Sequence, residues 1–201
     1  IRRPPRSTLS PSSAASDVYK RQVVEQWAKV YERKKCKVLI ARRFDFSATG
    51  THLTAFYCDS WIVGPHTFWC ARGISGDDAK ILTLWFNSIF GMAQLLFSRR
   101  ETRGAFIDLD KYKLATLIVP DPRKLSKNIR MKFLNLFNSL RTIRWPSILD
   151  QLERRYLHRM ALDKTILSAF GYRGDIDALL DQLYDIFAQE IRTLKELMRG
   201  K

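Results

Sequence analysis

The pattern of apolar and polar positions changes character near Ser126. Before it, short runs rich in β-branched and aromatic residues are separated by turn residues, which is typical of strands. These runs are KVLIA at 37–41, THLTAFY at 51–57, WIV at 61–63 and TFWCA at 67–71. After Ser126 the apolar positions recur with the spacing of amphipathic helices.

The longest apolar stretch, residues 81–97, predicts one long buried helix that forms the spine of the core. Ser75 can cap its N-terminus, and Asp77 and Asp78 lie in the positively polarised first turn. The stretch is shorter than the about 20 apolar residues that cross a bilayer, and it carries Asn87 near its middle, where a polar group is costly. We therefore expect a core helix and no membrane partner.

Further strand-like residues follow this helix. Residues 105–109 predict a strand and residues 111–114 a basic turn, and the apolar run 117–119 ends at Pro120 and Pro122, which terminate the sheet region. The expected fold class is α+β: a small mixed or antiparallel sheet packed on the long buried helix, followed by an all-helical C-terminal tail.

Helical stripes fill the remainder, and the clearest runs from Ile176 to Met198 after a capping Asp175. We expect a helix or linker at 23–35, an α+β domain at 36–125 and a helical tail at 126–201.

Residues 1–22 differ from everything after them and have little apolar periodicity. Ser12–Gln22 back-translates into a sequence that resembles a common transposase-based sequencing adapter, and residues 1–8 into the primer that precedes it. We therefore expect 1–22 to be a non-native, disordered segment and the native chain to be truncated before Val23. The alternative is a genuine disordered tail rich in Ser, Pro and Arg.

Charge narrows the class of partner. The net charge is +15; residues 1–22 carry five Lys or Arg and one Asp, so 30 basic and 19 acidic side chains remain, or +11. Such an excess favours a polyanion, most often nucleic acid and sometimes an anionic membrane surface. The three cysteines, Cys36, Cys58 and Cys70, form no CxxC pair and predict buried free thiols in a reducing cytoplasm.

Catalytic and metal-binding motifs are missing from the sequence. It has no Walker loop and no GxSxG elbow, and His52, His66 and His158 lack metal-ligand spacing. The DDAK segment at 77–80 superficially resembles a nuclease carboxylate–lysine cluster. Its place at a predicted helix start favours the ordinary role of acidic residues beside the helix dipole.

A cluster of arginines follows the long helix. Arg99, Arg100 and Arg103 lie within five residues, with Thr102 between them. A guanidinium fits phosphate oxygens or the O6/N7 edge of guanine. A solvated basic helix end, which complements the C-terminal dipole, is the alternative, and charge alone does not choose between the two.

Several motifs between 38 and 125 occur in a characteristic order. They are ARRFD at 41–45 followed by GTH at 50–52, LWFNS at 84–88, RETRG at 100–104, and LDKYKL at 109–114 leading to VPDP at 119–122. This order resembles the region after the catalytic domain of adenine-specific DNA methyltransferases of the restriction-modification or phage-defence type. The resemblance covers about half of the native chain, and LWFNS with RETRG is its most distinctive part.

The resemblance implies a target-recognition region that grips double-stranded DNA while another domain binds S-adenosylmethionine and flips the adenine. The family's glycine-rich cofactor loop and Asn/Asp-Pro-Pro-aromatic motif do not occur in residues 23–201. We therefore expect a fragment that is inactive alone and binds no cofactor, with S-adenosylmethionine bound by the parent protein. The expected DNA-binding residues, with base readout assigned to the 99–103 loop, are Arg42, Arg43, Arg99, Arg100, Thr102, Arg103, Lys111 and Lys113.

Two other classes of function remain open. In a non-catalytic interaction module, the C-terminal helices would dock a partner subunit and the basic bias would be surface composition. An RNA-binding fragment would stack single-stranded bases on Trp61, Phe68 and Trp69, although strand aromatics more often pack in cores.

Overall fold

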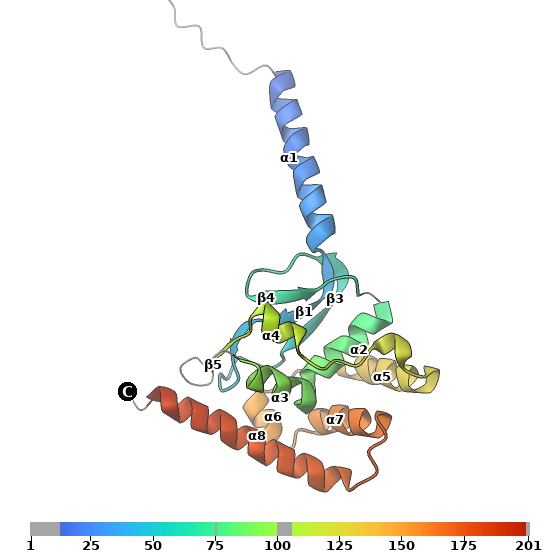
Figure 1. Cartoon of the computed structure of the whole chain (residues 1–201), viewed down its shortest axis with the longest axis vertical. Coiled ribbons are helices and arrows are strands. Elements are labelled where there is room, and N and C mark those ends of the chain that lie inside the picture. The colour runs from blue at the N-terminus through green and yellow to red at the C-terminus, as the bar shows by residue number, and fades with distance from the viewer. Residues whose placement is uncertain (1–12, 75, 100–105, 200–201) are drawn as a thin grey trace, which may run out of the picture.

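The computed structural model describes residues 13–74, 76–99 and 106–199, and its fold is α+β, as expected (Figure 1). The elements in chain order are α1 (Ser13–Lys34), β1 (Cys36–Ala41), β2 (Arg43–Asp45), β3 (Ala55–Ile62), β4 (Phe68–Ala71), α2 (Gly76–Asn87), α3 (Ile89–Phe97), β5 (Phe106–Asp108), α4 (Lys111–Ala115), the 3-10 helix η1 (Pro122–Lys124), α5 (Lys127–Leu140), α6 (Ile148–Glu153), α7 (Leu157–Ala169) and α8 (Ile176–Arg199).

The strands form two antiparallel sheets. β1 is the middle strand of the order β3–β1–β4, with Val38 opposite both Tyr57 and Ala71. The strands expected at 51–57 and 61–63 are in fact one strand, β3, which lies at the edge of the sheet, where the polar pair at 59–60 is exposed to solvent. β2, which was not expected, pairs with β5.

One hydrophobic core joins the sheet to the helical tail. Val38 of β1, Leu95 of α3 and Ile148 of α6 belong to the same cluster of buried residues as Tyr184 and Ile191 of α8. The boundary expected at 125/126 therefore divides residues that share one core.

The expected single helix is wrong, because it is broken at Ser88 into α2 and α3, which meet at a bend of 66°. Ser88 Oγ donates to the Trp85 carbonyl at 2.6 Å and accepts from the Gly91 N–H at 3.2 Å, which caps α3. A side chain at Gly91 would overlap the Trp85 carbonyl. Within the described residues no single helix is long and apolar enough to cross a membrane; α2 and α3 reach that length only as a bent pair.

Asn87, the last residue of α2, completes the edge of β3. Its Oδ1 accepts from the N–H groups of Thr54 at 2.8 Å and Ala55 at 3.1 Å, and its Nδ2 donates to the Ala55 carbonyl at 2.7 Å. The side-chain amide thereby replaces the peptide group of a neighbouring strand. The NS pair of LWFNS thus both bends the helix and attaches it to the sheet.

Two buried charged side chains of α7, Arg159 and Asp163, hold the bend from the other side. The Arg159 guanidinium donates to the Asn87 carbonyl and to Gln151 Oε1, the latter from Nε at 3.1 Å and Nη2 at 2.7 Å. Asp163 accepts from the Ile89 N–H at 2.9 Å and from the Tyr184 hydroxyl at 2.7 Å. Burial raises the pKa of Asp163 to about 6, and the Arg159 charge opposes that rise.

The N-terminal helix differs from the expected disorder over residues 13–22. These residues form the first part of α1, which extends away from the rest of the molecule (Figure 1), whereas residues 1–12 lie outside the described residues. The end of α1 is attached by the Tyr31 hydroxyl, which donates to the Trp61 carbonyl at 3.0 Å. The expected basic turn at 111–114 is also a helix, α4, which Asp110 caps.

Replacing Asn87 with alanine tests the amide junction. Asn87→Ala leaves the Thr54 and Ala55 N–H groups and the Ala55 carbonyl without their buried partner, so we expect a loss of about 3 kcal/mol in the free energy of unfolding. Urea denaturation measures it, and Asn138→Ala, at an exposed position of α5, is the matched control. Equal stabilities of the two variants would contradict the assignment.

The buried carboxyl of Asp163 predicts a pH dependence. Its pKa is about 6 in the folded protein against an ordinary value of 3.8, so its contribution to stability is greatest below pH 3.8 and falls as the pH rises to 6. Asp163→Asn cannot titrate. The stability difference between wild type and Asp163→Asn should therefore shrink by about 2 kcal/mol between about pH 4.5 and about pH 7.5. A difference that stays constant over this range in urea denaturation would disprove it.

Candidate nucleic-acid interface

A hollow lies at the end of the three-stranded sheet where β1 finishes at Ala41 and β4 begins at Phe68. The loop 50–53 and the segment 144–145 form its other walls, and its volume is about 610 Å³. We call it the sheet-end groove. Its lining residues are Ala41, Arg43, Phe44, Gly50, Thr51, His52, Leu53, Phe56, Phe68, Arg144 and Trp145.

The sheet-end groove combines positive charge with aromatic rings. Arg43 and Arg144 supply the charge, and none of the described residues that line the groove is acidic. Phe56 and Phe68 meet edge to face on the floor, with ring centroids 5.8 Å apart. Cationic grooves with aromatic platforms are typical of surfaces that hold single-stranded nucleic acid, and the positive charge by itself also suits the phosphates of a duplex.

Two walls of the groove are joined by hydrogen bonds to the start of α6. The Ile148 N–H donates to the Thr51 carbonyl at 2.9 Å. Gln151 Nε2 donates to the carbonyls of His52 at 2.8 Å and Pro146 at 2.7 Å. Since Gln151 Oε1 also accepts from Arg159, the buried network around the helix bend fixes the distance between the walls.

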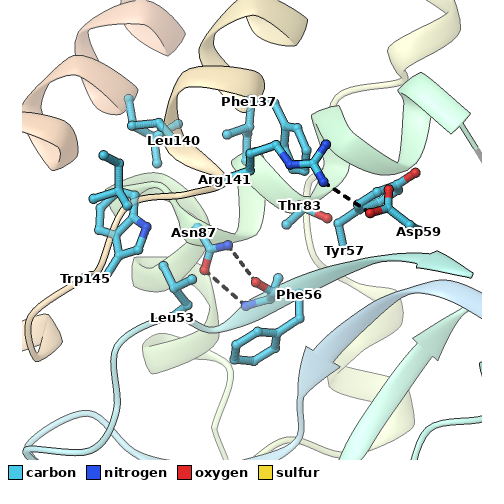
Figure 2. Close-up of a pocket in the computed structure, with 14 residues that line it drawn as sticks. Leu53, Phe56, Tyr57, Asp59, Thr83, Asn87, Phe137, Leu140, Arg141 and Trp145 are labelled. Atoms are coloured by element: carbon cyan, nitrogen blue, oxygen red, sulfur yellow. Dashed lines mark hydrogen bonds and ion pairs between the residues drawn. The ribbon is translucent and has the colours of Figure 1, made fainter.

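A second hollow, which we call the inner cavity, lies between β3, α2 and α5 (Figure 2). Its volume is about 260 Å³, and it shares Leu53, Phe56 and Trp145 with the sheet-end groove. Tyr57 and Phe137 also line it, with ring centroids 5.3 Å apart. The two hollows therefore adjoin across Trp145.

Arg42 and Arg43, both expected on the DNA face, separate in their roles. Arg42 stacks over Trp69, with 4.8 Å from Cζ to the ring centroid, and its half-buried guanidinium donates to the His66 carbonyl at 3.4 Å. Arg43 is more exposed and lines the groove, with Asp108 3.4 Å away. Of the two, Arg43 is the one placed to meet a ligand.

The arginine cluster after α3 is described only at its first residue. Arg99 Nη1 donates to the Leu96 carbonyl at 2.8 Å, and Nη2 lies 3.9 Å from Glu190 of α8. With only 20% of its side chain exposed, Arg99 lies as a cation at a helix end, the arrangement that the alternative describes, and its contact with DNA stays a prediction. Arg100, Thr102 and Arg103 lie outside the described residues, so their part in base readout stays a prediction.

The remaining expected residues, Lys111 and Lys113, are exposed on α4 and flank Tyr112, which is 84% exposed. This helix begins three residues after Asp108, the strand partner of Arg43. A short basic surface with one aromatic ring therefore follows the β2–β5 pair.

Sequence reasoning missed a long cationic segment. Residues 122–149 contain seven basic side chains and no acidic one: Arg123, Lys124, Lys127, Arg130, Lys132, Arg141 and Arg144. The pattern was visible in the sequence as an acid-free run. Only the structure shows that its end, at 141–145, lines both hollows.

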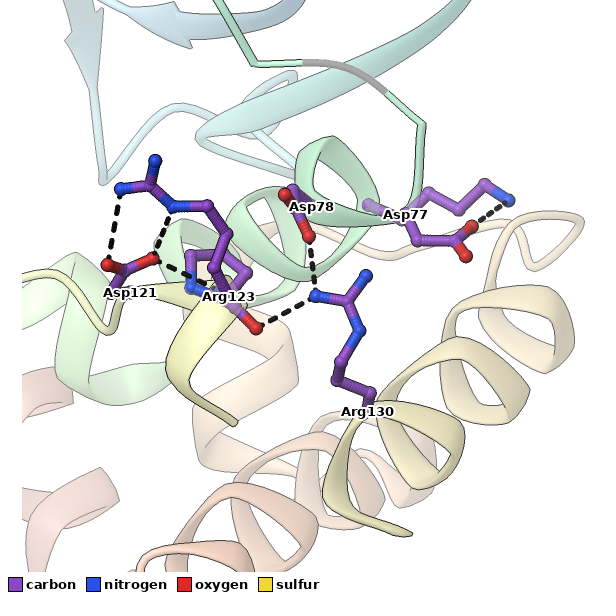
Figure 3. A network of polar contacts seen from close by, with 7 residues as sticks. Asp77, Asp78, Asp121, Arg123 and Arg130 are labelled. Carbon is purple, nitrogen blue, oxygen red and sulfur yellow. Dashed lines mark hydrogen bonds and ion pairs between the residues drawn. The ribbon is translucent and has the colours of Figure 1, made fainter. Parts of the chain in front are cut away.

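The acidic side chains at the start of α2 form ion pairs with basic side chains (Figure 3). Asp77 pairs with Lys80 at 3.1 Å, and Asp78 pairs with Arg130 Nη1 at 2.5 Å. Arg130 also donates to the Pro122 carbonyl at 2.8 Å, which ties α2 to η1 and α5. In the part of the chain that is described, no group of three or more His, Cys, Asp or Glu side chains is arranged to hold a metal ion.

Removing the Arg130 contacts tests this structural role. Arg130→Gln removes a half-buried ion pair and a hydrogen bond to a backbone carbonyl, so we expect a loss of about 1 kcal/mol in unfolding free energy. Lys132→Gln, an exposed position of the same helix, removes the same charge and should change stability little. Thermal denaturation of both variants measures the difference, and equal melting temperatures would contradict a stabilising role for the Arg130 contacts.

Comparison of the chain with protein-family models, curated proteins and solved structures finds no match in any of the three. The likeness to adenine-specific DNA methyltransferases therefore rests on the short motifs at 41–52, 84–88, 100–104 and 109–122.

Proposed function

We propose that this chain is the DNA-binding, target-recognition region of an adenine-specific DNA methyltransferase, and that the sheet-end groove is part of its DNA-binding surface. The observation that carries the proposal is the lining of that groove, which combines Arg43 and Arg144 with four aromatic rings and contains no described carboxylate. A surface of this composition attracts an anionic strand and repels cationic partners.

The charge of the cationic segment at 122–149 supports a polyanionic partner. Lys124, Lys127, Lys132 and Arg144 are exposed, and no carboxylate of the described residues lies within ion-pair distance of them. Unpaired cations gain most from phosphate, because each contact releases counterions condensed on the DNA. The α4 lysines, Lys111 and Lys113, would add contacts of the same kind.

The rigidity of the groove supports specific rather than merely electrostatic binding. Gln151 bonds to the carbonyls of His52, in the wall at 50–53, and of Pro146, next to the wall at 144–145, and it is itself bonded to the buried Arg159. A preformed site loses little conformational entropy on binding, so more of the interaction energy remains for affinity.

Within a methyltransferase the proposed division of labour is simple. This region would position the duplex, while S-adenosylmethionine and the groups that hold the flipped adenine would belong to another part of the enzyme. Restriction-modification and phage defence are the settings in which such enzymes act.

Salt titration of duplex binding tests the proposal. Log affinity should fall linearly with log salt, with a slope of about −0.9 per phosphate contacted, and Arg144→Ala and Arg43→Ala should each make the slope shallower by about 0.9. Arg173→Ala, at an exposed arginine between α7 and α8 outside both hollows, removes the same charge and should leave the slope unchanged.

Selection from random duplexes adds the specificity test. A recognition region should enrich one sequence motif that contains adenine. Enrichment of no duplex motif would overturn target recognition, and a preference for single-stranded RNA, or binding to neither nucleic acid, would favour the two other classes of function.

A further inference from the structure

We propose that the inner cavity receives one nucleobase that has left its stack, an inference that rests on the proposed nucleic-acid function. We distinguish the cavity from the pocket in which a methyltransferase modifies its flipped base, because the Asn/Asp-Pro-Pro-aromatic motif of that pocket does not occur in residues 23–201. Its size, its polar groups and its connection to the sheet-end groove each point to a flat heteroaromatic ring.

Size and lining fit a flat ring. The volume of about 260 Å³ exceeds that of an engineered cavity of about 150 Å³ that binds benzene. The walls come from Tyr57 of β3, Phe137 of α5 and Trp145 of the following loop (Figure 2), and from Leu84 of α2. Base–aromatic stacking on such walls tolerates any base, because every base has a π-face.

The free edge of β3 supplies a donor and an acceptor at the cavity wall. Both the N–H and the C=O of Ala55 point away from β1, because both bond to the Asn87 amide. In an antiparallel strand the residue two positions on presents its two groups to the same side, so the N–H and C=O of Tyr57 face the same way. Such a pair matches the adjacent donor and acceptor on the edge of a nucleobase.

Trp145 supplies one further donor. Its ring packs edge to face on Tyr156 with centroids 5.8 Å apart and has Arg159 Cζ 5.4 Å from its centroid, and its Nε1 forms no hydrogen bond within the described residues. Two other polar side chains of the wall are committed: Asn87 to β3, and the Thr83 hydroxyl to the Ala79 carbonyl at 2.9 Å. The Trp145 indole N–H and the backbone N–H and C=O of Tyr57 are therefore the groups to which a base can bond.

The connection between the hollows gives the base a route. Leu53, Phe56 and Trp145 line both, and Arg144 lies beside Trp145 on the groove side. The phosphate of an extruded nucleotide can thus stay with Arg144 in the sheet-end groove while its base enters the cavity. Asp59 also lines the cavity, but Arg141 pairs with it at 3.2 Å, which lowers the repulsion of a nucleotide.

The test compares a duplex that carries one unpaired adenine with the same duplex fully paired. Stacking in the cavity should make the unpaired duplex bind about tenfold more tightly. Ile143→Trp fills the cavity and should abolish this preference without changing affinity for the paired duplex. Leu157→Trp, at an exposed position outside both hollows, adds the same side chain and should keep the preference.

A second variant keeps the test decisive if Ile143→Trp does not fold. Trp145→Phe retains a ring but removes the indole N–H, and should lower the preference about threefold. Paired-duplex binding without any preference for the unpaired adenine would overturn this inference and leave the proposed function standing. If no duplex binds, equilibrium dialysis of deoxyadenosine decides. Saturable binding to wild type but not to Ile143→Trp would uphold the cavity, and absence of nucleoside binding would reject it.

Discussion

The fold depends on one buried junction, in which the Asn87 amide bonds to the edge of β3 while the Arg159 guanidinium bonds to the Asn87 carbonyl. A buried amide and a buried cation are costly unless every polar atom finds a partner. Here the partners come from the sheet, from α6 and from α7. Because burying the Asn87 amide and the Arg159 guanidinium without partners is unfavourable, the stable arrangement is the one in which the sheet, the bent helix and the tail meet at these groups.

That junction also determines the candidate site. Gln151 accepts from Arg159 with its carbonyl oxygen and donates with its nitrogen to the carbonyls of His52 and Pro146. The same side chain thus belongs to the core and supports two walls of the sheet-end groove. A change in the core would be transmitted to the groove through this amide, without any contact between the core and a ligand.

Charge density along the sequence and charge available on the surface differ in this protein. Arg99 belongs to the densest arginine cluster but bonds to its own helix end and lies near Glu190, and Arg42 stacks on Trp69. Arg144 lies at the more sparsely charged end of the 122–149 segment, yet it lines the groove and is exposed. A cation contributes to binding through its unpaired, accessible surface, and tertiary packing determines which cations keep it.

The sequence by itself determined the α+β class, the core strands β1 and β4, the tail helices and the basic character, because periodicity, propensity and net charge are local or additive properties. The sequence carries residues that favour a break, Asn87, Ser88 and Gly91, but an apolar helix pattern continues through them. Contacts with β3 and α7 stabilise the bent conformation over a straight helix. Three other features are likewise contacts between distant segments. They are the continuation of β3 through its polar residues 59–60, the pairing of β2 with β5, and the approach of residues 50–53 to residues 141–145. Tertiary structure decided these, because a side chain's partner across the core is absent from its own neighbourhood in the sequence.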